Sequence, residues 1–70
     1  MKYEVWTNVG GTKRVDGWEG VMECIGLDLG KGSYCERMVA TRTNKDEGMT
    51  WSWYWVGEDG VGEVTEMIDG

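Results

Sequence analysis

Regular alternation of large apolar and smaller residues marks one stretch of the chain as a strand. Between Thr50 and Val56 the tryptophans recur with a period of two, at Trp51, Trp53 and Trp55. In an extended strand these three indoles leave one face, and the residues between them leave the other. Aromatic residues favour strands, and a large ring can bury roughly 150 to 250 Å². We therefore expect a strand here whose indole face is covered, either by the protein's own core or by a partner.

A second alternating stretch, residues 2–9, is followed by Gly10-Gly11. A two-residue Gly-Gly loop is a hairpin signal, because both positions can take a positive φ without steric cost. A hairpin with this loop predicts two cross-strand pairs: Trp6 with Val15, and Tyr3 with Trp18.

Residues 61–68 form the last predicted strand, and a turn bounded by glycines joins it to the tryptophan strand. Two registers fit this turn. A three-residue loop that ends in Gly60 sets Tyr54 opposite Val64, whereas a two-residue loop sets Trp55 opposite Val64. Both registers give the aromatic strand an apolar neighbour, so a hairpin is predicted without a unique register.

Residues 15–29 allow two interpretations. Five apolar residues fit one face of an amphipathic helix: Val15, Trp18, Met22, Ile25 and Leu29. Three glycines oppose that helix, because together they would cost roughly 3 kcal/mol relative to alanine. They are Gly17, Gly20 and Gly26. The alternative is a turn over 16–20 followed by a strand over 21–29, and the glycine content favours this strand.

The whole pattern predicts a mostly β protein with a single domain over residues 1–70. A further strand is expected over 34–43, after a glycine-rich turn. Runs of six to ten residues separated by glycine are typical of a small antiparallel meander or a barrel-like twisted sheet, here of five to six strands. The alternative fold is α+β, with one short helix within residues 13–29.

Charge is unevenly distributed along the chain. The formal net charge is −6, yet residues 46–70 hold seven acids and no lysine or arginine. Such a segment repels phosphate backbones and anionic membranes, and it attracts basic surfaces. Direct binding to nucleic acid or to a membrane is therefore not expected.

The sequence offers little equipment for catalysis. It contains no histidine, which removes imidazole-based catalysis and imidazole metal ligands. Cys24 and Cys35 are too few for a four-ligand zinc site, and we expect both to be reduced. The adjacent carboxylates at 46–47 and 58–59 fall in predicted polar turns rather than in a desolvated pocket. We therefore expect no enzymatic activity, no metal and no cofactor.

These features favour a non-enzymatic binding protein that occupies a basic surface of another protein, such as a site that binds nucleic acid. Spaced carboxylates can imitate the phosphates of nucleic acid, and small acidic chains are common among viral inhibitors of host machinery. Tyrosine and tryptophan are over-represented at interface hot spots. We expect the contacts to come from acids and rings together: Glu58, Asp59, Glu63, Glu66, Asp69, Trp51, Trp53 and Tyr54.

A second hypothesis is a small structural or assembly subunit that forms a homo-oligomer through an aromatic face. For location, no N-terminal stretch combines a basic start with an apolar run, and no apolar run is long enough to span a bilayer. We expect a cytoplasmic protein, in the host cytoplasm if it is viral.

Overall fold

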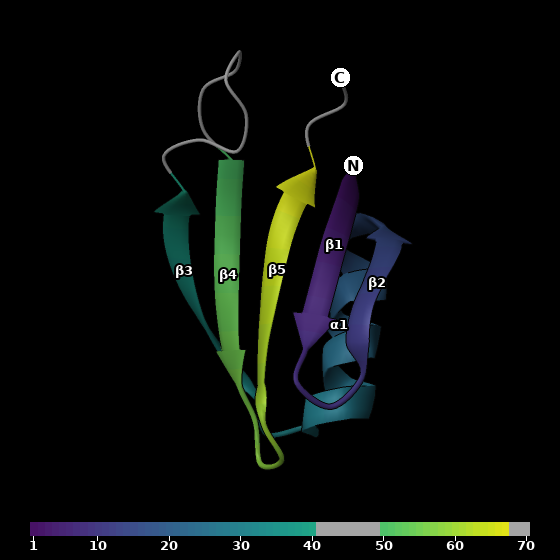
Figure 1. Ribbon diagram of the computed structural model, residues 1–70, viewed down its shortest axis with the longest axis vertical. Helices are drawn as coiled ribbons and strands as arrows, with labels where there is room; N and C mark the ends of the chain where they lie inside the picture. Colours follow the sequence, from purple (N-terminus) through teal and green to yellow (C-terminus); the bar gives the residue numbers. More distant parts are fainter. Residues whose placement is uncertain (41–49, 68–70) are drawn as a thin grey trace.

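The computed structural model of the protein describes residues 1–40 and 50–67. In these ranges it forms five strands and one helix: β1 (Lys2–Thr7), β2 (Gly11–Asp16), α1 (Gly17–Leu29), β3 (Tyr34–Ala40), β4 (Thr50–Val56) and β5 (Val61–Met67). All neighbouring strands are antiparallel, and they form one sheet in the order β2-β1-β5-β4-β3 (Figure 1). The predicted mostly β fold is confirmed, as an open sheet with β2 and β3 at its edges.

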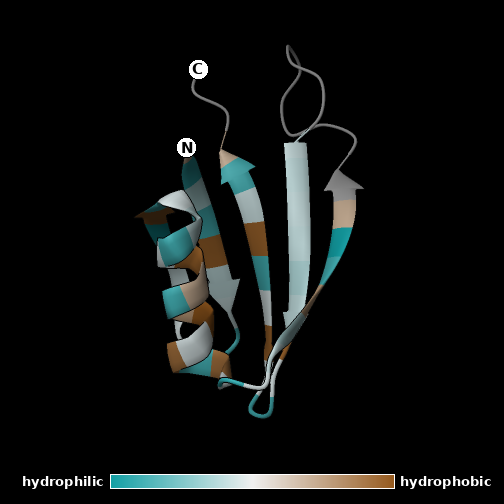
Figure 2. Ribbon diagram, turned by 180° about the vertical axis from the view of Figure 1, so that it is seen from behind, coloured by the Kyte–Doolittle hydropathy of each residue, from teal (hydrophilic) through white to brown (hydrophobic). Residues whose placement is uncertain are grey.

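The sheet is divided into a covered part and an uncovered part. Strands β3, β4 and β5 follow one another as a meander, and β1 joins this meander to β2 by pairing with β5. Helix α1 lies on one side of the sheet, against β1, β2 and β5. Figure 2 shows that β3 and β4 extend beyond the helix on this side. The structure therefore contains both the predicted antiparallel sheet and the short helix of the α+β alternative.

Helix α1 occupies the segment in which glycine content favoured a strand, so the strand predicted over 21–29 is wrong and the helical alternative is correct. Two of the three glycines have a structural reason to be glycine. Gly17 begins the helix with a φ of 76°, which glycine adopts readily. Gly20 lies against Val15 of β2, where an added Cβ would approach the Val15 Cβ to 2.9 Å. Gly26 has no such neighbour within 4 Å, so it alone carries the usual penalty of about 1 kcal/mol.

Helix α1 is amphipathic, but its buried stripe differs from the predicted face: Val15 lies in β2, Met22 is 48 % exposed, and Val21 is buried instead. Val21, Ile25 and Leu29 recur at intervals of four residues and are buried against the sheet. Leu27, between the last two, is 78 % exposed. The helix ends at Gly30, whose N–H donates a hydrogen bond of 3.2 Å to the Gly26 carbonyl. One apolar stripe therefore holds the helix on the sheet.

The first hairpin forms, but in a different register from the predicted one. Its pairs are Trp6 with Thr12 and Tyr3 with Val15. The loop is Asn8–Gly10, and Gly11 follows it with a φ of 79°. The Thr7 hydroxyl accepts a hydrogen bond of 2.8 Å from the Gly10 N–H. The loop therefore begins two residues earlier than predicted and contains only the first of the two glycines, which moves every cross-strand pair.

The last hairpin also forms, and neither predicted register is correct. Its pairs include Val56 with Val61 and Trp53 with Val64. The loop is therefore 57–60, and the Gly57 N–H donates to the Gly60 carbonyl at 2.9 Å. The Asn8 side chain accepts a hydrogen bond of 2.8 Å from the Val61 N–H. A residue of the first hairpin thus helps to fix the register of the last one.

The indole face of β4 points toward α1, as the period of two predicts. Trp18 of α1 lies 4.9 Å from Trp53 and 5.6 Å from Trp55, measured between ring centroids. Tyr3 of β1 adds a T-shaped contact to Trp18 at 5.3 Å. Edge-to-face pairs of this kind stabilise by about 0.5 to 1.5 kcal/mol beyond their buried area. The aromatic cluster therefore ties the start of α1 to the middle of the sheet.

The core lies between α1 and the sheet. Its buried apolar residues are Val5, Val21, Ile25, Leu29, Trp55 and Val64. Gly62 of β5 lies under the helix, where an added Cβ would meet Leu29 at 3.0 Å and Ile25 at 3.2 Å. A side chain at this position would separate the two layers, so glycine allows the helix to approach β5.

Candidate functional site

The side of the sheet away from α1 is here called the open face. It consists of the alternate residues of each strand that share a side with Trp6 of β1 and Tyr54 of β4. Figure 1 views the sheet from this side, with α1 behind it. Within residues 1–40 and 50–67, no helix or strand packs on it. Thr50 and Ser52, on this side of β4, are nevertheless buried, so the accessible part of the open face begins at Tyr54.

Four residues of the open face lie side by side across four strands. The register pairs Trp6 with Glu63, Glu63 with Tyr54, and Tyr54 with Glu36. Neighbouring strands are roughly 4.8 Å apart, so this cross-strand row spans about 14 Å. Rings and carboxylates therefore alternate along it, with each acid beside a ring.

Three residues of the row are exposed and Tyr54 is half-buried, and two apolar side chains flank the β3 end of the row. Trp6 is 40 % exposed, and Glu63 and Glu36 are exposed. Tyr34 and Met38, the neighbours of Glu36 on the same side of β3, are 61 % and 43 % exposed. Exposed aromatic and apolar side chains gathered on one surface are typical of a protein interaction site.

The unpaired charges in the row are negative. Two cations lie elsewhere on the open face, and both have partners: Lys2 lies 3.9 Å from Asp16, and Arg14 lies 3.4 Å from Glu4. In the part of the chain that the structure describes, no lysine or arginine lies within 4.0 Å of Glu36 or Glu63. Among the described residues, the carboxylates of Glu36 and Glu63 therefore have no cationic partner.

The acids predicted for partner binding occupy several places. Glu63 lies in the cross-strand row. Glu58 and Asp59 are exposed in the β4–β5 loop, at the end of the sheet away from the N-terminus (Figure 1). Glu66 pairs with Tyr3 on the helix side of β5 and is half-buried. Asp69 lies outside the described residues. The structure thus brings one of these acids into the row and leaves three described ones outside it.

The three predicted rings also separate. Tyr54 lies on the open face, beside Glu63. Trp53 packs on the helix side against Trp18, and Trp51 lies under the Arg37 guanidinium, which is 3.7 Å from its ring centroid. Cation–π contacts of this kind stabilise exposed sites by about 0.5 to 1 kcal/mol. Trp51 and Trp53 are therefore engaged within the protein, whereas Tyr54 is half-buried on the open face.

Two members of the row, Trp6 and Glu36, were not predicted as site residues. The alternation of residues 2–9 already sets Trp6 on the side opposite to Tyr3, so its position carried a signal. No sequence signal pointed to Glu36, because its nearness to Tyr54 depends on the pairing of β3 with β4 across a long connection. The pairing of Trp6 with Glu63 likewise joins the first and last strands.

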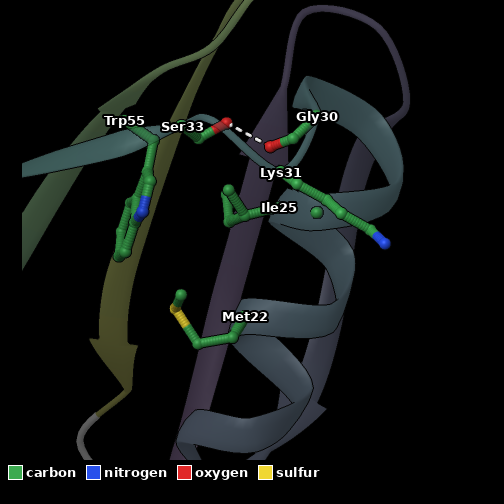
Figure 3. Close-up of a pocket in the computed structure, with 7 residues that line it drawn as sticks. Met22, Ile25, Gly30, Lys31, Ser33 and Trp55 are labelled. Atoms are coloured by element: carbon green, nitrogen blue, oxygen red, sulfur yellow. Dashed lines mark hydrogen bonds between the residues drawn. The ribbon is translucent and has the colours of Figure 1, made fainter.

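A small hollow opens on the helix side, between the second half of α1 and β4. Its volume is about 190 Å³, and Met22, Ile25, Lys31 and Trp55 are among its lining residues (Figure 3). The amino group of Lys31 points away from the hollow (Figure 3). The Ser33 hydroxyl is directed to the Gly30 carbonyl at 2.7 Å. The hollow therefore offers mainly apolar contacts and no free acid or base.

Both cysteines are free thiols. Cys24 of α1 is partly buried against the core, and Cys35 of β3 is exposed at the edge of the sheet. Partial burial raises the pKa of the Cys35 thiol above its ordinary value of 9.0. Because the thiolate is the nucleophile, a raised pKa makes Cys35 a poor nucleophile near neutral pH.

Within the described ranges, no group of three or more histidine, cysteine, aspartate or glutamate residues is arranged to hold a metal ion. No described helix has the length and apolar character needed to cross a membrane.

The chain matched no protein-family model, no curated protein and no solved structure.

Proposed function

We propose that the protein is a non-enzymatic binding protein whose open face docks on a basic surface of a partner protein. The observation that carries the proposal is the cross-strand row, in which Trp6, Glu63, Tyr54 and Glu36 alternate as rings and unpaired acids. Rings bury large areas at an interface, and carboxylates orient a cationic partner.

Charge complementarity specifies the character of the partner surface. The chain has a net charge of −6, and the cations of the open face are already paired with Glu4 and Asp16. A neutral or acidic partner would leave Glu36 and Glu63 without compensation at a desolvated interface, which is costly. A partner surface rich in lysine and arginine compensates them.

Among basic protein surfaces, those that bind nucleic acid suit the carboxylates and rings of the open face well. Their lysines and arginines are spaced to meet phosphates, and the open face offers carboxylates in a comparable role. Occupation of such a surface would exclude nucleic acid from it, so the protein would act as an inhibitor, as small viral proteins of this character do. Direct binding of nucleic acid by the row is disfavoured, because its carboxylates repel phosphates.

The proposal is tested by capture from a lysate of the cells in which the protein is found, with three immobilised forms. These are the unaltered protein, the variant Glu36→Lys/Glu63→Lys, and the control variant Glu19→Lys/Glu23→Lys. The control changes the net charge by the same amount, through exposed residues of α1 on the other side of the sheet.

We expect the unaltered protein and the control to retain the same basic proteins, with retention falling steeply between low and moderate salt. The Glu36→Lys/Glu63→Lys variant should lose them. Equal capture by all three forms would refute the proposal. Retention of only further copies of the chain would refute it too, and would instead support a homo-oligomeric subunit.

A further inference from the structure

We infer that Trp6, Glu63 and Tyr54 form a binding position for one arginine side chain of the partner. This inference rests on the proposed function and specifies the chemistry of its contact. The three residues lie on three neighbouring strands, β1, β5 and β4, with the carboxylate in the middle.

The spacing of the strands suits a single planar cation. Strands β1 and β4 flank β5, so their backbones are roughly 10 Å apart at this level of the sheet. Glu63 lies on the strand between those that carry the two rings, directly opposite each of them in the register, and it is exposed. A guanidinium above Glu63 has a ring on each side, and each ring needs roughly 3.5 to 4 Å for van der Waals contact. The position is wide enough for one such group.

The chemistry of the three side chains is complementary to arginine in two ways. A carboxylate can accept two parallel hydrogen bonds from a guanidinium, which is the stronger geometry of an ion pair. Tryptophan and tyrosine rings attract a cation to their faces. The protein already forms one such contact on its helix side, where the guanidinium of Arg37 lies 3.7 Å from the ring centroid of Trp51.

Within residues 1–40 and 50–67, no side chain occupies this position as an ion-pair or hydrogen-bond partner of Glu63. Arg14, which lies on the same side of β2, is paired with Glu4 at 3.4 Å rather than with Glu63. Among the described residues, Glu63 has no cation within 4.0 Å and makes no side-chain hydrogen bond. Arginine is preferred over lysine here, because a compact, strongly hydrated ammonium group stacks on rings less well than a planar guanidinium.

The test uses the full chain with ¹⁵N-labelled tryptophan and three capped tripeptides, Gly-Arg-Gly, Gly-Lys-Gly and Gly-citrulline-Gly. Citrulline has nearly the shape of arginine without its charge. We expect the arginine peptide to shift the Trp6 indole N–H signal with a Kd in the millimolar range, which is typical of a single contact. The lysine peptide should bind at least threefold more weakly, and the citrulline peptide should give no saturable shift.

Two variants localise the effect. Glu63→Gln should weaken the arginine peptide at least fivefold, whereas Glu23→Gln on α1 should leave its Kd unchanged. Equal shifts from arginine and citrulline peptides, or an unchanged Kd in Glu63→Gln, would overturn the arginine position. If either result occurs while Glu36→Lys/Glu63→Lys still abolishes protein capture, only the arginine position fails. Unchanged capture by that variant would overturn the proposed function as well.

Discussion

The two sides of the sheet use the same residue types in opposite ways. On the helix side, Trp18 contacts both Trp53 and Trp55, and Trp55 is only 2 % exposed. On the open face, Trp6 and Tyr54 are separated by Glu63. Rings that touch one another stabilise the fold. Rings that are separated by an acid leave part of their surface exposed, and the carboxylate between them adds a negative charge that a partner can meet.

The two sides of the sheet also differ in how closely another backbone segment approaches the strands. Glycines at positions 20 and 62 allow α1 to lie directly on β2 and β5. The open face has no described element pressed against it. Substitutions should therefore reduce stability strongly on the helix side and weakly on the open face, and matched pairs of variants can break or sharpen this comparison.

The largest contrast is expected between two tryptophans. Trp55→Ala should lower the free energy of unfolding by about 3 to 5 kcal/mol, because it leaves a cavity in the core. That loss is comparable to the whole stability of a domain of this size. Trp6→Ala should cost about 1 kcal/mol, mainly through lost cross-strand contacts. Urea unfolding followed by circular dichroism measures both, and equal losses would contradict the division between the two sides.

A smaller contrast concerns two glycines near the end of α1. A Cβ on Gly57 would overlap the Leu29 carbonyl oxygen and lie 2.6 Å from the Ser33 hydroxyl oxygen. Gly57→Ala should therefore cost about 2 to 3 kcal/mol through overpacking. Gly32→Ala has nothing within 4 Å of its added Cβ and should change stability by less than about 0.5 kcal/mol. Thermal melts of both variants check the contrast. A Gly57→Ala protein as stable as the parent would show that the β4–β5 loop does not pack on the helix.

Hydrogen bonding provides a third contrast, between two threonines. The buried hydroxyl of Thr7 donates to Asp28 at 2.7 Å and accepts from the Gly10 N–H. Thr7→Val keeps the shape and removes both bonds, so we expect a loss of about 1 to 2 kcal/mol. Thr12 is exposed on the open face, and Thr12→Val should change stability by less than about 0.5 kcal/mol. Denaturant titrations decide the point, and a larger effect at Thr12 would reverse it.

The smallest effects are expected at two arginines. Arg37→Ala removes the guanidinium from Trp51 and should cost about 0.5 to 1 kcal/mol. Arg14→Ala removes an exposed ion pair with Glu4 and should cost less than about 0.5 kcal/mol. Tryptophan fluorescence offers a second readout, because only Arg37→Ala should alter the emission of Trp51. An altered spectrum in Arg14→Ala alone would contradict these assignments.

Local patterns were sufficient to predict several elements of the fold. The period of two in the tryptophan strand predicted both β4 and the side that its indoles share. Turn residues predicted both hairpins. These signals depend on residues close together in the chain, so the sequence contains them directly.

Features that depend on distant contacts could not be predicted in this way. The glycine content of residues 15–29 argued against predicting a helix there. The presence of Gly20 is explained only by its contact with Val15 of β2. The last register depends on the bond from the Val61 N–H to Asn8. The cross-strand row requires β1 to pair with β5, which nothing in either strand specifies by itself. The candidate site is therefore a product of the topology.

The most direct test of the account asks which tryptophan the captured partner touches. The chain contains five tryptophans, and Trp6 is the one that the register places on the open face. In a complex of ¹⁵N-tryptophan-labelled protein with its partner, cross-saturation from the partner should attenuate the Trp6 indole N–H signal and leave the other four nearly unchanged. Attenuation of the Trp51 or Trp53 signal with Trp6 unaffected would place the partner on the helix side and contradict the account.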